Sequence, residues 1–198
     1  MSIKYTLAAA TAALFLGSGV THAGLLDSSV TVNLEGVGFG GPLAGPITVT
    51  GGSVEFPGID LSFNGDPAYS ADITDSRITV SHYQNGFTTS FSGDYNDPAS
   101  INGFEFVFTN APAITGASLN ISDSTLRFPL TPPRITFTDN SIFVNFAGSF
   151  SSGDAPPDSY AVDVTFAPVP EPSTGALAFA GMVAIGIFVR LRVKTAHR

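Results

Sequence analysis

The sequence predicts an all-β fold, an antiparallel two-sheet sandwich that resembles a jelly roll, with an N-terminal signal helix and a C-terminal transmembrane helix outside it. Three observations predict the β-domain. Apolar residues alternate with polar ones, turn-forming dipeptides separate these runs, and no long stretch between the two ends has helical periodicity. About ten short strands in one domain favour a sandwich, with a barrel as the alternative architecture.

Alternation with a period of two residues is clearest in four runs: Val30–Leu34, Phe104–Thr109, Arg134–Thr138 and Tyr160–Phe166. Such runs are typical of strands with one buried face. Shorter β-rich runs predict further strands at Ile47–Thr50, Ser53–Phe56, Asp60–Phe63, Arg77–Tyr83, Phe87–Phe91, Ala117–Ser122, Thr125–Phe128 and Ser141–Phe146.

Turn signals fall between many of these runs. Asn64-Gly65, Asn85-Gly86 and Asn102-Gly103 supply residues that accept a positive φ, so the sequence predicts chain reversals there. Asp139-Asn140 lies between two alternating runs, which predicts a two-residue hairpin turn.

The composition excludes several classes of protein. Charged residues make up only 12% of the 198 residues and there are 17 phenylalanines, which argues against disorder. Fifteen acidic residues and three arginines lie between Gly24 and Val169, a net charge of −12. Such a body repels phosphate backbones, so we expect no nucleic-acid partner. Cysteine is absent, which excludes disulfides, thiolate catalysis and cysteine-based zinc sites.

The N-terminal segment has the pattern of a secretory signal peptide. Lys4 precedes the apolar run Leu7–Leu16, and small or turn-forming residues follow up to Ala23. This pattern predicts a signal peptide at residues 1–23 that is cleaved between Ala23 and Gly24. The apolar run is too short to span a bilayer. The alternative is a buried N-terminal helix.

The C-terminal segment has the pattern of a membrane span. Residues 174–189 carry no charge and extend about 24 Å as a helix, slightly less than a hydrocarbon core. A basic segment follows at residues 190–198, with positive charges at Arg190, Arg192, Lys194 and Arg198. Because positive charges favour the cytoplasmic side, the body is predicted to lie outside the membrane, in agreement with the signal peptide.

Between the body and this span, residues 167–173 contain the extended segment Val169-Pro170-Glu171-Pro172-Ser173. A Pro-Glu-Pro motif, a single span and an arginine-rich end closely resemble the PEP-CTERM sorting signal. This resemblance covers about thirty residues. It implies processing by exosortase, a membrane-embedded transpeptidase-like enzyme, and an anchored intermediate before the cell surface is reached. The alternative is a permanent single-pass anchor after a proline linker. A sortase signal of the form Leu-Pro-x-Thr-Gly does not fit.

Two motifs in the predicted domain, residues 24–166, could carry chemistry. His82 is the only histidine there and is in phase with apolar residues of its run, so we expect it to face the core. There is no Gly-x-Ser-x-Gly elbow to make it the base of a hydrolase. Residues 36–41 formally fit Gly-x-Gly-x-x-Gly, but prolines rather than a helix follow, which favours a glycine-rich loop over a dinucleotide site.

An acidic loop, residues 93–98, contains Asp94 and Asp97. Carboxylates and amides at loop ends can bind calcium in exported β-sandwiches, so these two residues are the candidate ligands if a cofactor is bound at all. Aspartate and asparagine are also ordinary turn residues, which is the alternative. A pair of acids for glycoside hydrolysis cannot be identified from sequence.

We therefore expect a non-enzymatic, exported surface or extracellular-matrix protein, sorted through its tail, whose β-domain is structural or binds a partner. The alternative is a carbohydrate-binding or adhesin module, with an extracellular polysaccharide as partner, acidic loops and the tyrosines Tyr69, Tyr83 and Tyr95 as exposed contacts. A hydrolase ranks lowest.

Overall fold

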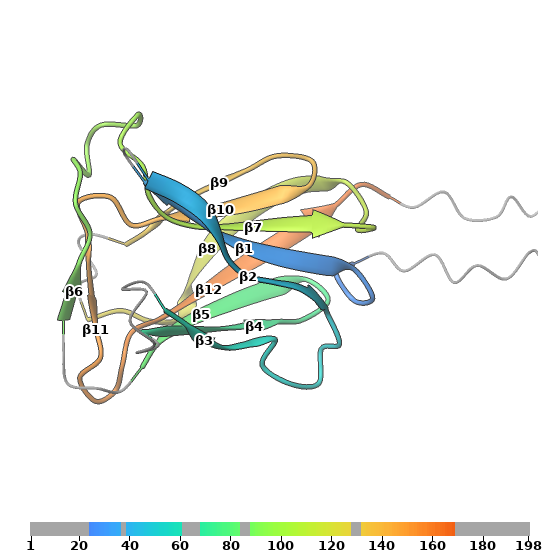
Figure 1. Ribbon diagram of the computed structural model, residues 1–198, viewed down its shortest axis with the longest axis horizontal. Coiled ribbons are helices and arrows are strands. Elements are labelled where there is room, and N and C mark those ends of the chain that lie inside the picture. Colours follow the sequence, from blue (N-terminus) through green and yellow to red (C-terminus); the bar gives the residue numbers. More distant parts are fainter. Residues whose placement is uncertain (1–23, 37–38, 61–67, 84–87, 128–131, 169–198) are drawn as a thin grey trace, which may run out of the picture. The chain divides into compact units, whose positions relative to one another are not determined.

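In the computed structural model the structure describes residues 24–36, 39–60, 68–83, 88–127 and 132–168, and these form an all-β domain with no helix. Two five-stranded antiparallel sheets pack face to face, and a two-stranded sheet lies at one end of them (Figure 1). The predicted β-sandwich class is confirmed. The predicted signal helix and transmembrane helix lie outside the described residues.

Sheet A has the strand order β2-β1-β7-β10-β9. Its strands are β1 (Ser29–Gly36), β2 (Phe39–Thr48), β7 (Asn102–Thr109), β9 (Arg134–Phe137) and β10 (Ser141–Asn145). Alternation in β1 and β7 sends Val30, Val32, Phe104 and Phe106 into the core, where each is fully buried. On the outer face, Glu35 of β1 and Glu105 of β7 are only partly buried.

Sheet B has the strand order β3-β4-β5-β12-β8. Its strands are β3 (Phe56–Ile59), β4 (Tyr69–Ile73), β5 (Arg77–His82), β8 (Ile114–Thr125) and β12 (Ser159–Phe166). The small end sheet pairs β6 (Thr88–Ser90) with β11 (Phe150–Ser152). The last strand in the chain, β12, therefore lies between β5 and β8 rather than at an edge.

Five aromatic rings join the two sheets at one end of the core. Phe146, which follows β10, contacts Tyr69, Phe91, Phe104 and Tyr160, with ring centroids 4.7 to 6.2 Å apart. Phe104 belongs to sheet A, whereas Tyr69 and Tyr160 belong to sheet B. Edge-to-face and offset contacts of this kind add to the free energy of burial. Phe146 is thus the common contact between the two sheets.

Buried carboxylates connect the loops around this core. Asp158 is 1% exposed, and its two oxygens accept hydrogen bonds from the backbone N–H groups of Arg127 and Ser152. The Glu55 carboxylate accepts backbone N–H groups from Thr50, Gly51 and Ile73 and so ties the loop before β3 to β4. Charged acceptors of backbone N–H groups form strong hydrogen bonds, which offsets the cost of burying them.

Several predicted elements are confirmed. Alternating runs at Val30–Leu34, Phe104–Thr109 and Tyr160–Phe166 lie in β1, β7 and β12. Asp139-Asn140 forms the hairpin turn between β9 and β10, closed by the Thr138 N–H, which donates to the Ser141 carbonyl oxygen at 2.9 Å. Asn64-Gly65 and Asn85-Gly86 lie outside the described residues.

Other predictions were wrong. Asn102-Gly103 does not turn the chain: it begins β7, and Gly103 is needed because a Cβ there would collide with the carbonyl oxygen of Val144 on β10. The glycine-rich loop predicted at residues 36–41 was placed over too many residues: Gly36 ends β1 and residues 39–41 begin β2, while residues 37 and 38 lie outside the described residues. As an edge strand, β2 tolerates its prolines. Strands β4 and β11 were not predicted, and β3 begins only at Phe56.

The aromatic cluster predicts that Phe146→Ala lowers the free energy of unfolding by about 3–5 kcal/mol, because it removes ring contacts to both sheets and leaves a cavity. Chemical denaturation of the purified protein would measure this change. The matched control is Phe150→Ala, whose side chain is 47% exposed; it should cost less than about 1 kcal/mol. Equal losses in the two variants would contradict the role assigned to Phe146.

Candidate functional site

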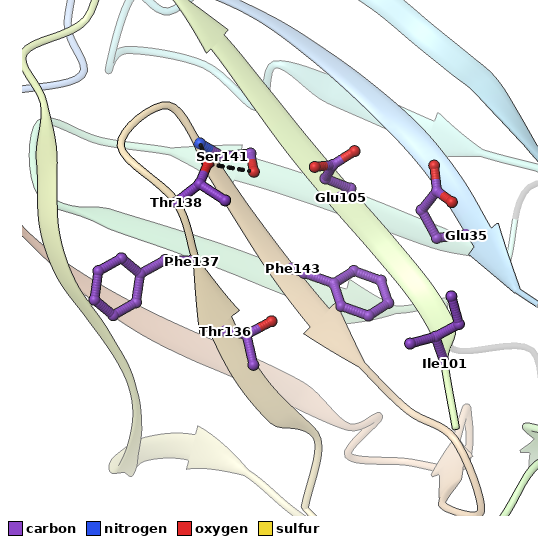
Figure 2. Close-up of a pocket in the computed structure, with 8 residues that line it drawn as sticks. All are labelled: Glu35, Ile101, Glu105, Thr136, Phe137, Thr138, Ser141 and Phe143. Carbon is purple, nitrogen blue, oxygen red and sulfur yellow. Dashed lines mark hydrogen bonds between the residues drawn. The ribbon is translucent and has the colours of Figure 1, made fainter. Parts of the chain in front are cut away.

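The outer face of sheet A contains a groove of about 370 Å³. Eight residues line it: Glu35, Ile101, Glu105, Thr136, Phe137, Thr138, Ser141 and Phe143. They come from β1, β7, β9 and β10 and the segments adjoining them (Figure 2). Its size is in the range of small-molecule sites.

Strand register explains why these residues gather. Thr136, Phe143, Glu105 and Asn33 are successive cross-strand partners on β9, β10, β7 and β1, so their side chains form one row on the outer face. The next row includes Asn145, Gly103 and Glu35. Gly103 contributes no side chain to this row.

The groove combines carboxylates with an aromatic ring. Glu35 and Glu105 project from the neighbouring strands β1 and β7, and the Phe143 ring points from β10 toward β7 (Figure 2). Glu105 is held in place by Asn33, whose Nδ2 donates to Glu105 Oε2 at 3.2 Å. The three hydroxyl residues of the groove, Thr136, Thr138 and Ser141, lie on β9 and β10 and in the turn that joins them.

On the outer face of sheet B, two carboxylates are paired with one arginine. Arg77 on β5 donates from Nε to Asp163 at 2.6 Å and forms an ion pair with Asp123 at 2.7 Å. Asn120 donates to the other oxygen of Asp163 at 2.8 Å. The hydrogen bond from Arg77 holds the pKa of Asp163 below its usual value, although desolvation acts in the opposite direction.

The other described arginines are engaged elsewhere. Arg127 pairs with Asp154 at 3.5 Å, and Arg134 donates to the backbone carbonyl oxygens of Asp97 and Ser100 at 2.8 and 2.7 Å. Within residues 24–36, 39–60, 68–83, 88–127 and 132–168, therefore, no arginine is paired with the carboxylates of the groove. The two outer faces differ in this respect.

Asp94 and Asp97, the candidate calcium ligands, lie in an exposed loop that follows β6. Asp94 Oδ1 accepts the Asn96 N–H at 2.9 Å, and Asp97 Oδ1 accepts the Ala99 N–H at 2.9 Å. These are the local bonds of Asx turns. In the described part of the chain no group of three or more histidines and carboxylates is placed to hold a metal ion.

His82 is buried on β5, as the sequence predicted, with 2% of its surface exposed. Its ring meets Tyr69 edge to face, with centroids 4.7 Å apart. Nδ1 lies 2.8 Å from the Tyr83 carbonyl oxygen, which can only accept, so Nδ1 carries the hydrogen of this bond. Nearby, desolvation strongly raises the pKa of Tyr160, so its phenol stays neutral.

Of the three tyrosines predicted as exposed contacts, Tyr69 was assigned wrongly. It is fully buried in the aromatic cluster, because the residues of β4 alternate and Tyr69 has the inward phase of Ala71 and Ile73. Tyr83 and Tyr95 are partly exposed. The residues of the groove were not singled out from sequence, since their rows exist only once the register of four strands is known.

The predicted sorting segment Val169–Ser173 and the basic residues after the span lie outside the described residues. Within the described part there is no helix long and apolar enough to cross a membrane. At the predicted signal cleavage site, Ala23 also lies outside the described residues, whereas Gly24 is the first described residue.

Comparison with known proteins identifies the tail. The family model of the PEP-CTERM protein-sorting motif matches residues 168–193. This match contains Val169–Ser173, the predicted span, Arg190 and Arg192, and ends before Lys194. It confirms the resemblance found in the sequence. No curated protein and no solved structure matches the chain.

The Arg77–Asp163 pair predicts a specific pH dependence. A carboxyl whose pKa is lowered in the folded state stabilises it above the unfolded pKa of about 4, and this contribution disappears as the pH falls below that value. Asp163→Asn should therefore lower Tm at pH 7 by a small amount, on the order of 1–3 °C, with the difference shrinking below about pH 4.

Thermal unfolding followed by circular dichroism between pH 3 and pH 7 would test this. The exposed turn residue Asp139 provides a control, because Asp139→Asn removes the same charge without removing an arginine contact. A difference for Asp163→Asn that persists unchanged at pH 3 would contradict the assignment.

Proposed function

We propose that this chain is an exported protein that is anchored temporarily by its C-terminal tail and then sorted to the cell surface or extracellular matrix by an exosortase-type enzyme. The observation that carries the proposal is the PEP-CTERM motif at residues 168–193. The signal-peptide pattern at residues 1–23 and the basic residues after the predicted span support the same orientation, with the body outside.

For the β-domain we propose a non-catalytic role, structural or binding. Its one histidine supports this, because His82 is buried and its Nδ1 is used by a backbone carbonyl. Ser81, its neighbour on β5, has the opposite phase and so points to the other face of the sheet. A hydrolase would be favoured instead if the protein had an activity that His82→Ala abolished without unfolding the domain.

The sorting proposal predicts the mass of the mature protein. In cells that possess the processing enzyme, the surface form should begin at Gly24 and end near Pro170–Ser173, because the tail is removed. Intact-mass spectrometry of protein recovered from the surface would measure both ends.

Two comparisons sharpen this measurement. In cells that lack the processing enzyme the basic tail should remain attached, and Glu171→Ala should have the same effect in cells that possess it. Lys194→Ala, which lies beyond the matched segment, provides the matched control and should be processed normally. A full-length tail in competent cells would favour a permanent anchor.

A second candidate function, carbohydrate binding, is favoured by the groove on sheet A. An open groove with an aromatic ring, hydroxyls and carboxylates offers stacking together with hydrogen-bond acceptors for sugar hydroxyls. This role is compatible with the same sorting tail. The proposed partner is an extracellular polysaccharide.

We propose further that the domain needs no cofactor, calcium included. Arg134 supports this: its guanidinium donates to the backbone carbonyl oxygens of Asp97, in the acidic loop, and of Ser100, just after it, and its Cζ lies 6.0 Å from the centre of the Tyr95 ring. A positive charge of the protein itself thus lies beside this loop.

This proposal predicts that removing calcium with a chelator leaves Tm unchanged within about 1 °C, whereas Arg134→Gln lowers it by several degrees, on the order of 3–6 °C. Differential scanning calorimetry with chelator, and then with millimolar calcium, would measure both effects. A rise in Tm with calcium that Asp94→Asn abolishes would show that the loop is a calcium site.

A further inference from the structure

The groove on sheet A is composed of rows with different chemistry. One row holds Thr136, Phe143, Glu105 and Asn33, and the row beside it holds Glu35 and Gly103. The carboxylates therefore come from adjacent strands and adjacent rows of a single face, with the Phe143 ring alongside them (Figure 2).

The negative charge of the groove determines which class of ligand it attracts. Both titratable groups that line the groove, Glu35 and Glu105, are acids, and no described basic residue lines it. The body as a whole carries −12 between Gly24 and Val169. A ligand with phosphate, sulfate or carboxylate groups would be repelled, whereas a positively charged group beside the two carboxylates would be attracted. An ammonium group near Phe143 also gains a cation–π attraction.

The lining also favours a saccharide over a peptide. The strands that form the floor, β7 and β10, are paired on both sides within sheet A, so among the strands of the groove an added peptide strand could form a ladder only with the edge strand β9. What the groove offers is side-chain acceptors and hydroxyls around an aromatic ring. A saccharide carries its own hydroxyl donors and a flat apolar ring face, which match this surface.

A second copy of the chain is a poor occupant. The described arginines Arg77, Arg127 and Arg134 are each engaged within their own chain, so a copy would offer the groove no unpaired guanidinium. Two bodies of charge −12 would also repel each other at low ionic strength.

We propose that the groove binds a saccharide bearing free amino groups, with Glu35 and Glu105 contacting the ammonium and Phe143 stacking on the sugar ring. This inference rests on the carbohydrate-binding role proposed above and specifies its ligand class. A ligand with an ammonium group would supply the positive charge that no described arginine supplies on the outer face of sheet A, whereas Arg77 supplies one on the outer face of sheet B.

The test uses the full chain in a neutral detergent and three probes: a glucosamine trisaccharide, its fully N-acetylated form and a glucose trisaccharide. Isothermal titration calorimetry is carried out at pH 6, where the amines of the glucosamine trisaccharide are protonated. We expect the glucosamine trisaccharide to bind at least about tenfold more tightly than the other two, with an affinity that falls as salt is added.

Variants separate the groove from the general negative charge. Glu105→Gln keeps an acceptor for Asn33 but removes the charge, and it should weaken binding of the glucosamine trisaccharide about tenfold, as should Glu35→Gln. Phe143→Ala should weaken all binding. Asp123→Asn removes one charge from the outer face of sheet B and should change affinity less than about twofold.

Each alternative outcome is distinct. Equal binding of all three probes, lost in Phe143→Ala, would keep the carbohydrate-binding role and overturn the amine preference. Equal weakening by Asp123→Asn and Glu105→Gln would show non-specific attraction and overturn the groove as the site. If none of the probes binds while the variants remain folded, both the ligand class and the carbohydrate-binding role fail.

Discussion

The contact that the rest of this structure depends on is the packing of Phe146 between the two sheets. Its ring meets Phe104 from sheet A and Tyr69 and Tyr160 from sheet B, at a point where the chain has just left β10. With these rings inside, β1 and β7 can place only their other residues outward, because strand side chains alternate. The groove on the outer face, including Glu35 and Glu105, is therefore a consequence of how the core packs.

The carboxylates on the outer faces of the two sheets have different hydrogen-bond partners. On sheet B, Arg77 pairs with Asp163 and Asp123, and Asn120 donates to Asp163, so part of the negative charge of that face is compensated. On sheet A, Glu105 is supported by an amide, Asn33, which positions a carboxylate without neutralising it. Exposed ion pairs add little to stability, so the difference matters more for what each face can attract than for the fold.

Alternation predicted the fold class and the strands with a clear inner face, because burial on one side imposes a period of two residues. It failed where tertiary contacts override a local signal. Asn102-Gly103 has the sequence of a turn, yet Gly103 is required by the close approach of the Val144 carbonyl group. Tyr69 was predicted to be exposed because β4 was not recognised. The groove was not predicted, since Phe143 and Glu105 become neighbours only through the β7–β10 register. The sequence indicates only that each of these two side chains has the outward phase of its strand.

The described β-domain and the matched sorting motif occupy separate parts of the chain. β12 stops at Phe166, before the matched motif begins at residue 168, so removal of the tail takes no strand from either sheet. β12 nevertheless lies between β5 and β8, so sheet B is complete only once Phe166 is in place. The groove strands β1, β7, β9 and β10 all belong to sheet A and precede β12 in the chain. If the chain is processed as proposed above, the cut would therefore fall outside both sheets and would leave the groove residues in place.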